Sequence, residues 1–212
     1  MSKPLAEPLT QTLTQPITES ITQALVQTEP SLSKQTLTQD APQHFLAQYL
    51  DTVPDFPKPG ILFSDISPLL NHHFHETIDA LSELFSAEEW SNIDCLAGIE
   101  SRGFIFASAL AYKHNKDFIT VRKPGKLPNV YASVSYGLEY GSDTLEMQKG
   151  DGRRVLLLDD LIATGGSMGA AITLCEKVGY QVVALACLID LVGLNRFQHG
   201  EMTVRSVIQF ND

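Results

Sequence analysis

The sequence has few cysteines, an excess of acidic over basic residues and no long hydrophobic run. Its three cysteines, Cys95, Cys175 and Cys187, lie in apolar surroundings without CxxC spacing. They predict buried thiols in a reducing compartment, the cytoplasm, rather than a disulfide framework or a zinc site. With 15 Lys and Arg against 25 Asp and Glu, the net negative charge disfavours nucleic acid and anionic membranes as partners. No apolar run approaches the ~18 residues of a membrane span.

The first 42 residues lack glycine, aromatic residues and arginine. Up to Gln43 there are eight threonines and seven glutamines, and TLTQ occurs at 12–15 and again at 36–39. Such a segment can bury little apolar area, so residues 1–42 are predicted to be a low-complexity extension, disordered or only partly helical. A docking helix is the alternative, because leucines and isoleucines recur at i,i+4 spacing around Pro16. Residues 43–212 are predicted to form the folded domain.

From residue 41 onward, helix and strand patterns alternate. Hydrophobic periodicity predicts helices over 41–53, 71–90, 103–115 and 167–179. Apolar runs predict strands over 93–99, 117–121, 153–160, 180–191 and 203–210. A basic loop over 122–132 and a hairpin around Gly141–Ser142 lie between them. The fold class is therefore α/β, a mostly parallel twisted sheet with helices on both faces, which binds ligands beyond the carboxyl ends of its strands.

The most informative stretch is VLLLDDLIATGGSMGAA, residues 155–171. An apolar strand runs into two carboxylates, and a loop of small residues leads into a helix that is predicted to begin at Ser167. Such a loop can direct several backbone N–H groups and the positive end of the helix dipole at one phosphate. It is neither a Walker loop nor GxGxxG. The phosphate would contact Ala163, Thr164, Gly165, Gly166 and Ser167.

Two carboxylates beside a phosphate site suit the hydroxyl groups of a ribose. Asp159 and Asp160 face opposite ways if the strand continues through them, so they are not expected to play equal parts. The structural alternative is that Asp160 caps a turn and TGGS only caps a helix.

Aliphatic residues, two acids and TGGS together resemble the phosphoribosyl pyrophosphate motif of type I phosphoribosyltransferases. Further stretches resemble the adenine phosphoribosyltransferase branch of that family. They are FPKPGILFSDISPLL (56–70), GIESRGFIF (98–106), VRKPGKLP (121–128) and LEYGSDTLEMQ (138–148). The resemblance covers about residues 53–191. Ser64 is a departure, since the family often has arginine there, and the loop at 147–155 is shorter than is common.

The resemblance implies a purine salvage enzyme that transfers a 5-phosphoribosyl group to adenine, giving AMP and pyrophosphate. It also implies Mg²⁺ carried by the substrate, with Asp159 and Asp160 as its possible protein contacts. A flexible hairpin lid, a small N-terminal element over the base, and a homodimer are further implications. Runner-up readings are a xanthine or hypoxanthine phosphoribosyltransferase and a non-catalytic regulator that senses phosphoribosyl pyrophosphate. The regulator would need a basic DNA-binding segment, and the first 42 residues carry only Lys3 and Lys34.

The same resemblance assigns roles to residues. Glu139 would manage a proton near N7 of the base, and Arg102 would act beside it as a catalytic residue. Adenine would be held by Leu62, Phe63 and Ser64. Pyrophosphate would be held by Ser101, Arg102, Arg122, Lys123, Lys126 and Tyr140. A cis peptide is implied at Glu100–Ser101.

Read from the residues alone, these side chains have ordinary alternatives. Arg102 could form a surface ion pair, the basic loop could be a solvated turn, and Glu139 could be an exposed hairpin residue. The histidines His72, His73 and His75 suggest a metal cluster, but surface histidines are the better interpretation because no cysteine is near.

Overall fold

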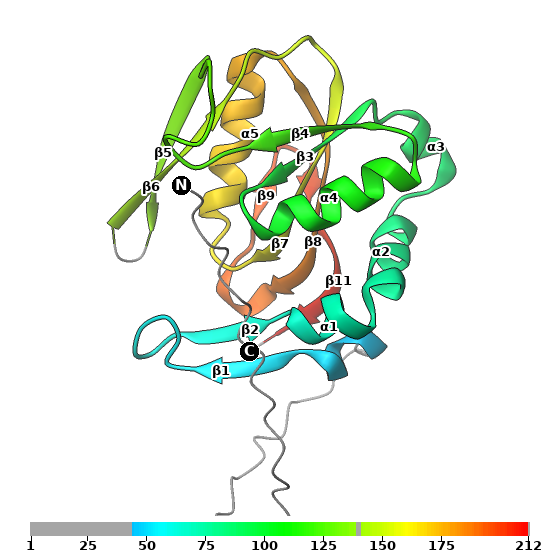
Figure 1. The fold of residues 1–212 in the computed structure, drawn as a ribbon, viewed down its shortest axis with the longest axis vertical. Coiled ribbons are helices and arrows are strands. Elements are labelled where there is room, and N and C mark those ends of the chain that lie inside the picture. The colour runs from blue at the N-terminus through cyan, green and yellow to red at the C-terminus, as the bar shows by residue number, and fades with distance from the viewer. Residues whose placement is uncertain (1–43, 139–140, 212) are drawn as a thin grey trace, which may run out of the picture. The chain divides into compact units, whose positions relative to one another are not determined.

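The computed structural model describes residues 44–138 and 141–211. A five-stranded sheet forms the centre, in the order β11-β8-β7-β3-β4, and all its neighbouring strands are parallel (Figure 1). The predicted α/β fold class is confirmed. The strands of this sheet are β3 (Cys95–Ile99), β4 (Asp117–Val121), β7 (Arg154–Ile162), β8 (Gln181–Leu191) and β11 (Arg205–Phe210).

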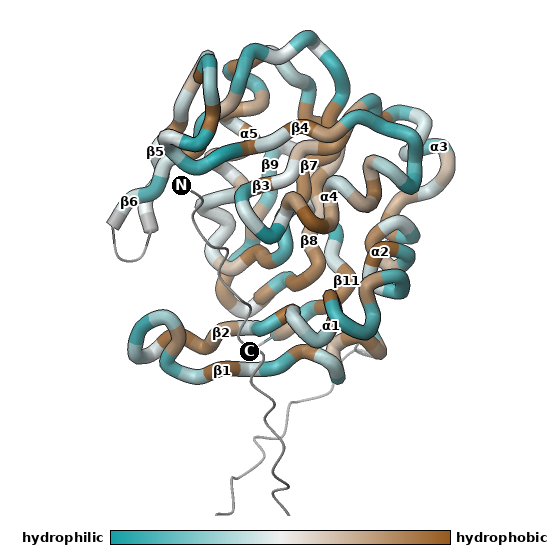
Figure 2. Tube along the Cα trace, in the orientation of Figure 1, coloured by the Kyte–Doolittle hydropathy of each residue, from teal (hydrophilic) through white to brown (hydrophobic). Residues whose placement is uncertain are grey.

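Helices cover both faces of the sheet, because side chains alternate along each strand. Leu156 and Leu158 of β7 pack into one core cluster with α2 (Phe74–Glu83) and α4 (Arg102–Lys113). Val155 and Leu157 pack into the other, with α5 (Gly166–Val178) and the hairpin of β5 (Ala132–Leu138) and β6 (Gly141–Met147). Hydrophobic colouring accordingly runs along β8 at the centre of the fold (Figure 2).

The single helix predicted over 71–90 is wrong. The chain forms three helices there, α1 (Ser67–His72), α2 and α3 (Ala87–Ser91). A capping box starts α3, in which the Ser86 hydroxyl accepts from the Glu89 N–H and the Glu89 carboxylate accepts from the Ser86 N–H. The His73 carbonyl starts α2 by accepting from both the N–H and the hydroxyl of Thr77. The helix is interrupted at His73, whose backbone leaves the helical region at φ −134 and ψ 28, and again before α3, where the capping box starts a new helix.

The helix predicted over 41–53 is also wrong in its second half. A 3₁₀ helix, η1 (Phe45–Tyr49), is followed by β1 (Asp51–Pro54), which pairs antiparallel with β2 (Leu62–Asp65). The β-branched Thr52 and Val53 favour the extended conformation once a partner strand is present. The resulting small hairpin carries Phe63 to the carboxyl end of the sheet.

The hairpin of β5 and β6 is confirmed, but its turn is not at Gly141–Ser142. Gly141 pairs with Leu138 and Ser142 pairs with Gly137, so both glycine and serine belong to the ladder. Short strands β9 (Gln198–His199) and β10 (Met202–Thr203), with the 3₁₀ helix η2 (Val192–Leu194), lie between β8 and β11.

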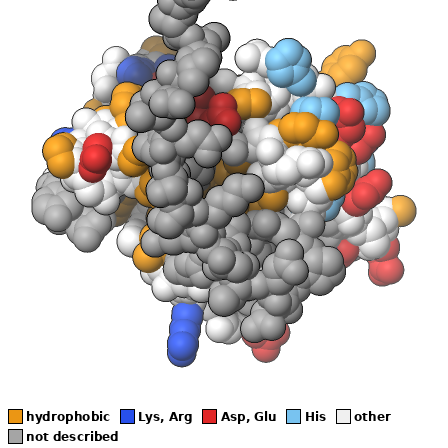
Figure 3. Space-filling model, turned by 90° about the horizontal axis from the view of Figure 1, so that it is seen from below, with side chains coloured by type: hydrophobic (Ala, Val, Ile, Leu, Met, Phe, Trp, Pro, Cys, Tyr) orange, Lys and Arg blue, Asp and Glu red, His pale blue; other side chains and the backbone are white. Residues whose placement is uncertain are grey.

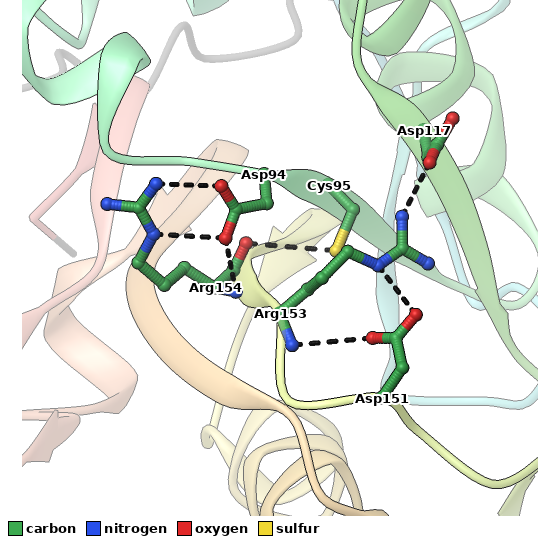
Figure 4. A network of polar contacts seen from close by, with 6 residues as sticks. All are labelled: Asp94, Cys95, Asp117, Asp151, Arg153 and Arg154. Carbon is green, nitrogen blue, oxygen red and sulfur yellow. Dashed lines mark hydrogen bonds and ion pairs between the residues drawn. The ribbon is translucent and has the colours of Figure 1, made fainter.

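Ion pairs tie together the amino ends of the central strands (Figure 4). Arg154 donates to both carboxylate oxygens of Asp94, through Nε at 3.0 Å and Nη2 at 2.7 Å. Arg153 donates to Asp151 at 2.8 Å and to Asp117 at 2.5 Å. These contacts join residues that precede β3, begin β4 and begin β7.

Cysteines and histidines lie largely as predicted. All three cysteines are free and buried. His72 and His75 are exposed, whereas His73 is half-buried and stacks on Tyr49 at 3.7 Å between ring centroids. No group of metal-ligating side chains forms in residues 44–138 or 141–211. Instead, Nδ1 of His75 lies 3.3 Å from Oδ2 of Asp79. Figure 3, which views the molecule from below, shows histidines beside carboxylates on the face turned to the reader. None of the helices described is long and apolar enough to cross a membrane.

Candidate active site

Three parallel strands end at the same edge of the sheet, and each is followed by residues predicted for the site. Ile99 of β3 leads to Ser101 and Arg102, Val121 of β4 leads to the basic loop, and Ile162 of β7 leads to the small-residue loop. Parallel strands bring their carboxyl ends together whatever their separation in sequence. The edge therefore gathers three of the predicted motifs.

The small-residue loop wraps the amino end of α5. Gly165 has φ +82 and is the N-cap of the helix, which begins at Gly166 rather than at Ser167 as predicted. A Cβ on Gly165 would lie 2.4 Å from Cδ2 of Phe197. Glycine is required there by both the positive φ and the close approach. Thr164 is exposed at this helix start, where the first N–H groups of a helix have no partner within the helix.

Phe197, which packs against this loop, was not identified from the sequence. Its backbone N–H donates to Oδ1 of Asn195 at 3.0 Å, and the Asn195 amide donates to Asp190 at 3.1 Å. The stretch LVGLNRF has no pattern that marks it as part of a phosphate loop. Only the return of the chain from β8 brings Phe197 onto Gly165.

The two acids are buried and have different partners, as the alternation of strand residues predicted. Oδ1 of Asp159 accepts from the backbone N–H of Asp160 at 2.9 Å. Oδ2 of Asp160 lies 2.7 Å from Nη2 of Arg102. This oxygen has no aligned hydrogen-bond donor among the described residues, so the contact with Arg102 is an ion pair. Asp160 therefore retains bonding capacity for a ligand.

Burial sets the protonation of this pair. It raises the pKa of Asp159 well above the usual range, and the nearby Asp160 carboxylate raises it further. Burial also raises the pKa of Asp160, while the Arg102 guanidinium opposes that rise. Burial and the neighbouring carboxylate therefore favour the protonated form of Asp159, whereas the Arg102 guanidinium favours the ionised form of Asp160.

Arg102 connects the acids to the N-terminal hairpin. Its Nη1 donates to the Ser64 carbonyl at 3.3 Å, and its guanidinium carbon lies 4.9 Å from the Phe63 ring centroid. Gly103 permits this placement, since a Cβ there would lie 2.8 Å from the Leu158 carbonyl oxygen of β7. Phe56 and Phe63 pack edge to face, with 5.0 Å between ring centroids, a contact that the sequence did not indicate.

All three cations of the basic loop are paired with carboxylates. Nε of Arg122 lies 3.0 Å from Glu100, and Nζ of Lys126 lies 2.8 Å from the same carboxylate. Nζ of Lys123 lies 3.1 Å from Asp143 of β6. Glu100 and Asp143 were not identified from the sequence, because nothing in it shows which carboxylates face this loop.

The remaining predicted residues divide into two groups. Leu62 and Ser101 are exposed at the site edge, and the peptide bond Glu100–Ser101 is cis, as the resemblance implied. Glu139 and Tyr140 lie outside the described residues. A helix-start anion site, two buried carboxylates and a cluster of cations together suit a sugar phosphate that carries a second anionic group.

Comparison with known proteins gives this site a family. The phosphoribosyl transferase domain family matches residues 69–201. The adenine phosphoribosyltransferase of Hydrogenovibrio crunogenus is 71% identical over 170 residues, which are 80% of this chain and 99% of the relative. That of Sorangium cellulosum is 49% identical over 152 residues, 69% of this chain and 74% of the relative.

Solved structures agree with the curated relatives. The adenine phosphoribosyltransferase of Rhodothermus marinus has a TM-score of 0.70 at 45% identity and covers 78% of this chain and 96% of its own. The enzyme of Saccharomyces cerevisiae was crystallised with adenine and an imino-altritol bisphosphate. It has a TM-score of 0.68 at 37% identity, and the match covers 77% of this chain and 96% of the yeast chain. The chain therefore belongs to the phosphoribosyltransferase family, within its adenine phosphoribosyltransferase branch.

Proposed function

We propose that this chain joins adenine to the 5-phosphoribosyl group of phosphoribosyl pyrophosphate, releasing AMP and pyrophosphate in purine salvage. The observation that carries the proposal is the ion pair of Arg102 with Asp160, at 2.7 Å, beside the glycine loop that precedes α5. Through this ion pair, an acid predicted to bind the ribose lies next to the arginine predicted to bind pyrophosphate. The same arginine contacts Ser64 and Phe63, which are predicted to bind the base. The high identity to curated adenine phosphoribosyltransferases supports the same reaction.

The ribose 5-phosphate would lie on the loop before α5. Backbone N–H groups and the Thr164 and Ser167 hydroxyls donate to its oxygens, and the helix dipole favours its charge. Asp159 and Asp160 accept from the ribose hydroxyls. Since bond breaking leads bond making, holding the ribose between these groups orients C1 for attack by N9 of adenine.

The leaving pyrophosphate would be held by cations and N–H groups at the ends of β3 and β4. These residues are Ser101, Arg102, Arg122, Lys123 and Lys126, and the resemblance adds Tyr140 from outside the described residues. Arg102 and Arg122 can each fork two phosphate oxygens. Each lysine ammonium group has three N–H donors, so Lys123 and Lys126 can donate to phosphate oxygens while each keeps its present carboxylate partner.

Mg²⁺ fits this site as an ion brought by the substrate. Two adjacent carboxylates are present, one of them with an oxygen lacking an aligned donor, and the residues described hold no third ligand that would complete a protein cage. Mg²⁺ commonly binds through one or two carboxylates together with substrate phosphates. Bound there, it would neutralise charge on the leaving group.

Adenine would stack on Phe63, with backbone groups of Leu62 and Ser64 at its edge. An N–H and C=O pair matches the N1 acceptor and N6 donor of adenine and rejects a 6-oxo purine. At present the Ser64 carbonyl accepts from Arg102, so base binding would compete with that bond. Glu139 keeps the role that the resemblance implies, proton transfer near N7.

We also propose a homodimer located in the cytoplasm. β4 is an edge strand of the sheet and exposes 37% of Phe118, and α4 beside it exposes 91% of Tyr112. Edge strands with exposed aromatic side chains are usually covered. The buried thiols are consistent with a reducing compartment. Light scattering should give twice the 23.3 kDa chain mass; a monomer at micromolar concentration would contradict the dimer.

Turnover with adenine tests the proposed reaction. Pyrophosphate release is measured with phosphoribosyl pyrophosphate, Mg²⁺ and either adenine, guanine, hypoxanthine or xanthine. We expect adenine to be preferred by at least ~10²-fold in kcat/KM, because a 6-oxo purine leaves the site's polar groups unpaired. Comparable rates with hypoxanthine would favour a different purine, and binding without turnover of any base would favour a ligand-sensing regulator.

A further inference from the structure

Glu100 is a buried carboxylate that contacts the basic loop at three points. It follows β3 directly, and its side chain is 8% exposed. Oε2 accepts from Nε of Arg122 at 3.0 Å and from the backbone N–H of Lys123 at 2.8 Å. Oε1 accepts from Nζ of Lys126 at 2.8 Å. One side chain thus holds both ends of the segment 122–126.

The contacts leave the phosphate-binding groups of the loop available. The bond to Nε of Arg122 fixes the plane of the guanidinium and leaves its two Nη groups, which are the fork that binds phosphate oxygens. The Arg122 guanidinium also lies over the Phe104 ring, 5.5 Å from its centroid. Glu146 holds the middle of the loop, since its carboxylate accepts from the Gly125 N–H at 3.1 Å.

Charge explains why a carboxylate is needed there. Arg122, Lys123 and Lys126 are three cations within five residues, and they repel one another unless an anion lies between them. Burial would raise the pKa of Glu100, but hydrogen bonds from Lys126, Lys123 and Arg122 overcome burial and lower the pKa to about 2. Glu100 therefore stays ionised at neutral pH and supplies a permanent negative charge.

We propose that Glu100 is a positioning residue, a fixed internal anion that holds the loop 122–126 in the geometry that receives pyrophosphate. The inference rests on the proposed function, in which this loop binds the leaving group. A competing role, in which Glu100 blocks the cations and pyrophosphate must expel it, predicts the opposite sign. Positioning is favoured because two of the three bonds go to Nε and to a backbone N–H, groups that need not contact pyrophosphate.

The test is Glu100→Gln, which keeps the size and removes the charge. We expect KM for phosphoribosyl pyrophosphate to rise about 10-fold or more, in the range of a charged hydrogen bond. The inhibition constant of pyrophosphate should rise by a similar factor, while kcat at saturation and KM for adenine change little. Glu89→Gln is the matched control, because Glu89 of α3 pairs with Arg205 of β11, away from this edge, and it should leave all four constants unchanged.

Two outcomes overturn the proposal. Unchanged constants for phosphoribosyl pyrophosphate and pyrophosphate in folded Glu100→Gln would remove the positioning role, and tighter binding would show that Glu100 competes with the substrate. If this variant does not fold, Glu100→Asp decides. It keeps the charge but withdraws it by one methylene, so KM should rise by a smaller factor, and an unchanged KM would contradict the proposal.

Direct binding separates this inference from the proposed function. Calorimetric titration of inorganic pyrophosphate with Mg²⁺ into wild type and Glu100→Gln needs no adenine and no turnover. Weaker binding by the variant supports Glu100 even if adenine proves not to be the substrate. Equal binding contradicts it even if adenine turnover is confirmed.

Discussion

At the scale of single residues, substitutions of Asp159 and Asp160 are expected to affect substrate binding and protein stability differently. Asp159→Asn and Asp160→Asn should each weaken phosphoribosyl pyrophosphate binding or turnover, by roughly 10–150-fold for the more important residue, because charged hydrogen bonds are lost. Burial raises the pKa of both in the folded state, so their ionised forms oppose folding at neutral pH. A raised folded pKa means that stability falls as pH rises through the shifted range.

The two asparagine variants should therefore melt no lower than wild type at pH 7 while losing activity. Steady-state kinetics and thermal unfolding of the same preparations check this. Wild-type kinetics in both variants would contradict the ribose assignment, and a large drop in melting temperature would show that the pair is structural.

Two constraints act on Gly165. Its φ is +82, and a Cβ added there would lie 2.4 Å from Cδ2 of Phe197. Gly165→Ala should raise KM for phosphoribosyl pyrophosphate by ~10-fold or more, since displacing the loop by a fraction of an ångström misaligns its N–H groups. Gly179→Ala is the matched control, because Gly179 has φ +104 with nothing within 4 Å of a Cβ. It should lower stability by ~1–2 kcal/mol from backbone strain alone and leave KM unchanged.

At the scale of elements, the pairing of Asp94 with Arg154 joins the segment before β3 to the start of β7. Hydrogen bonds from the Arg154 side chain lower the pKa of Asp94 far below its usual range. A depressed folded pKa contributes stability that is present above the unfolded pKa of ~3.9 and is lost as pH falls below it. Asp94→Asn should melt below wild type at pH 7, and the difference should shrink as pH falls below ~4.

Thermal unfolding of wild type and Asp94→Asn from pH 7 to pH 3 measures this convergence. Glu83→Gln, an exposed carboxylate at the end of α2, serves as the control and should follow the wild-type curve. A difference between Asp94→Asn and wild type that is independent of pH would mean that packing, not charge, holds the two segments together.

For the whole molecule, the core of the described residues extends from Leu46 to Ile208. The match to the Hydrogenovibrio crunogenus relative includes 99% of that protein but only 80% of this chain. We therefore expect deletion of residues 1–40 to leave fold and adenine turnover intact. Kinetics and thermal unfolding of the truncated chain test this. A tenfold loss of activity in a folded truncation would give the extension a role.

Sequence alone determined the features that local chemistry controls. The aliphatic run of β7, the two acids within that strand, the glycine loop and the Gly179 stop of α5 follow one another along the chain. Their arrangement in space therefore follows from their spacing in sequence. Parallel strand topology then put Arg102 and the basic loop at the same edge. The non-helical backbone of His73 and the capping box at Ser86 interrupt the hydrophobic period, which is why the long helix was predicted wrongly.

Only the tertiary structure decided which distant residues support those motifs. Glu100 meets Lys126 across 26 positions, Phe197 covers Gly165 from beyond β8, and Asp143 reaches Lys123 from the neighbouring hairpin. The sequence around a carboxylate or a phenylalanine does not reveal its distant partner, because that contact depends on the order of the strands in the sheet and on the path of the connecting loops. The sequence therefore predicted the groups proposed to bind substrate, and the packed fold decided which side chains hold those groups in place.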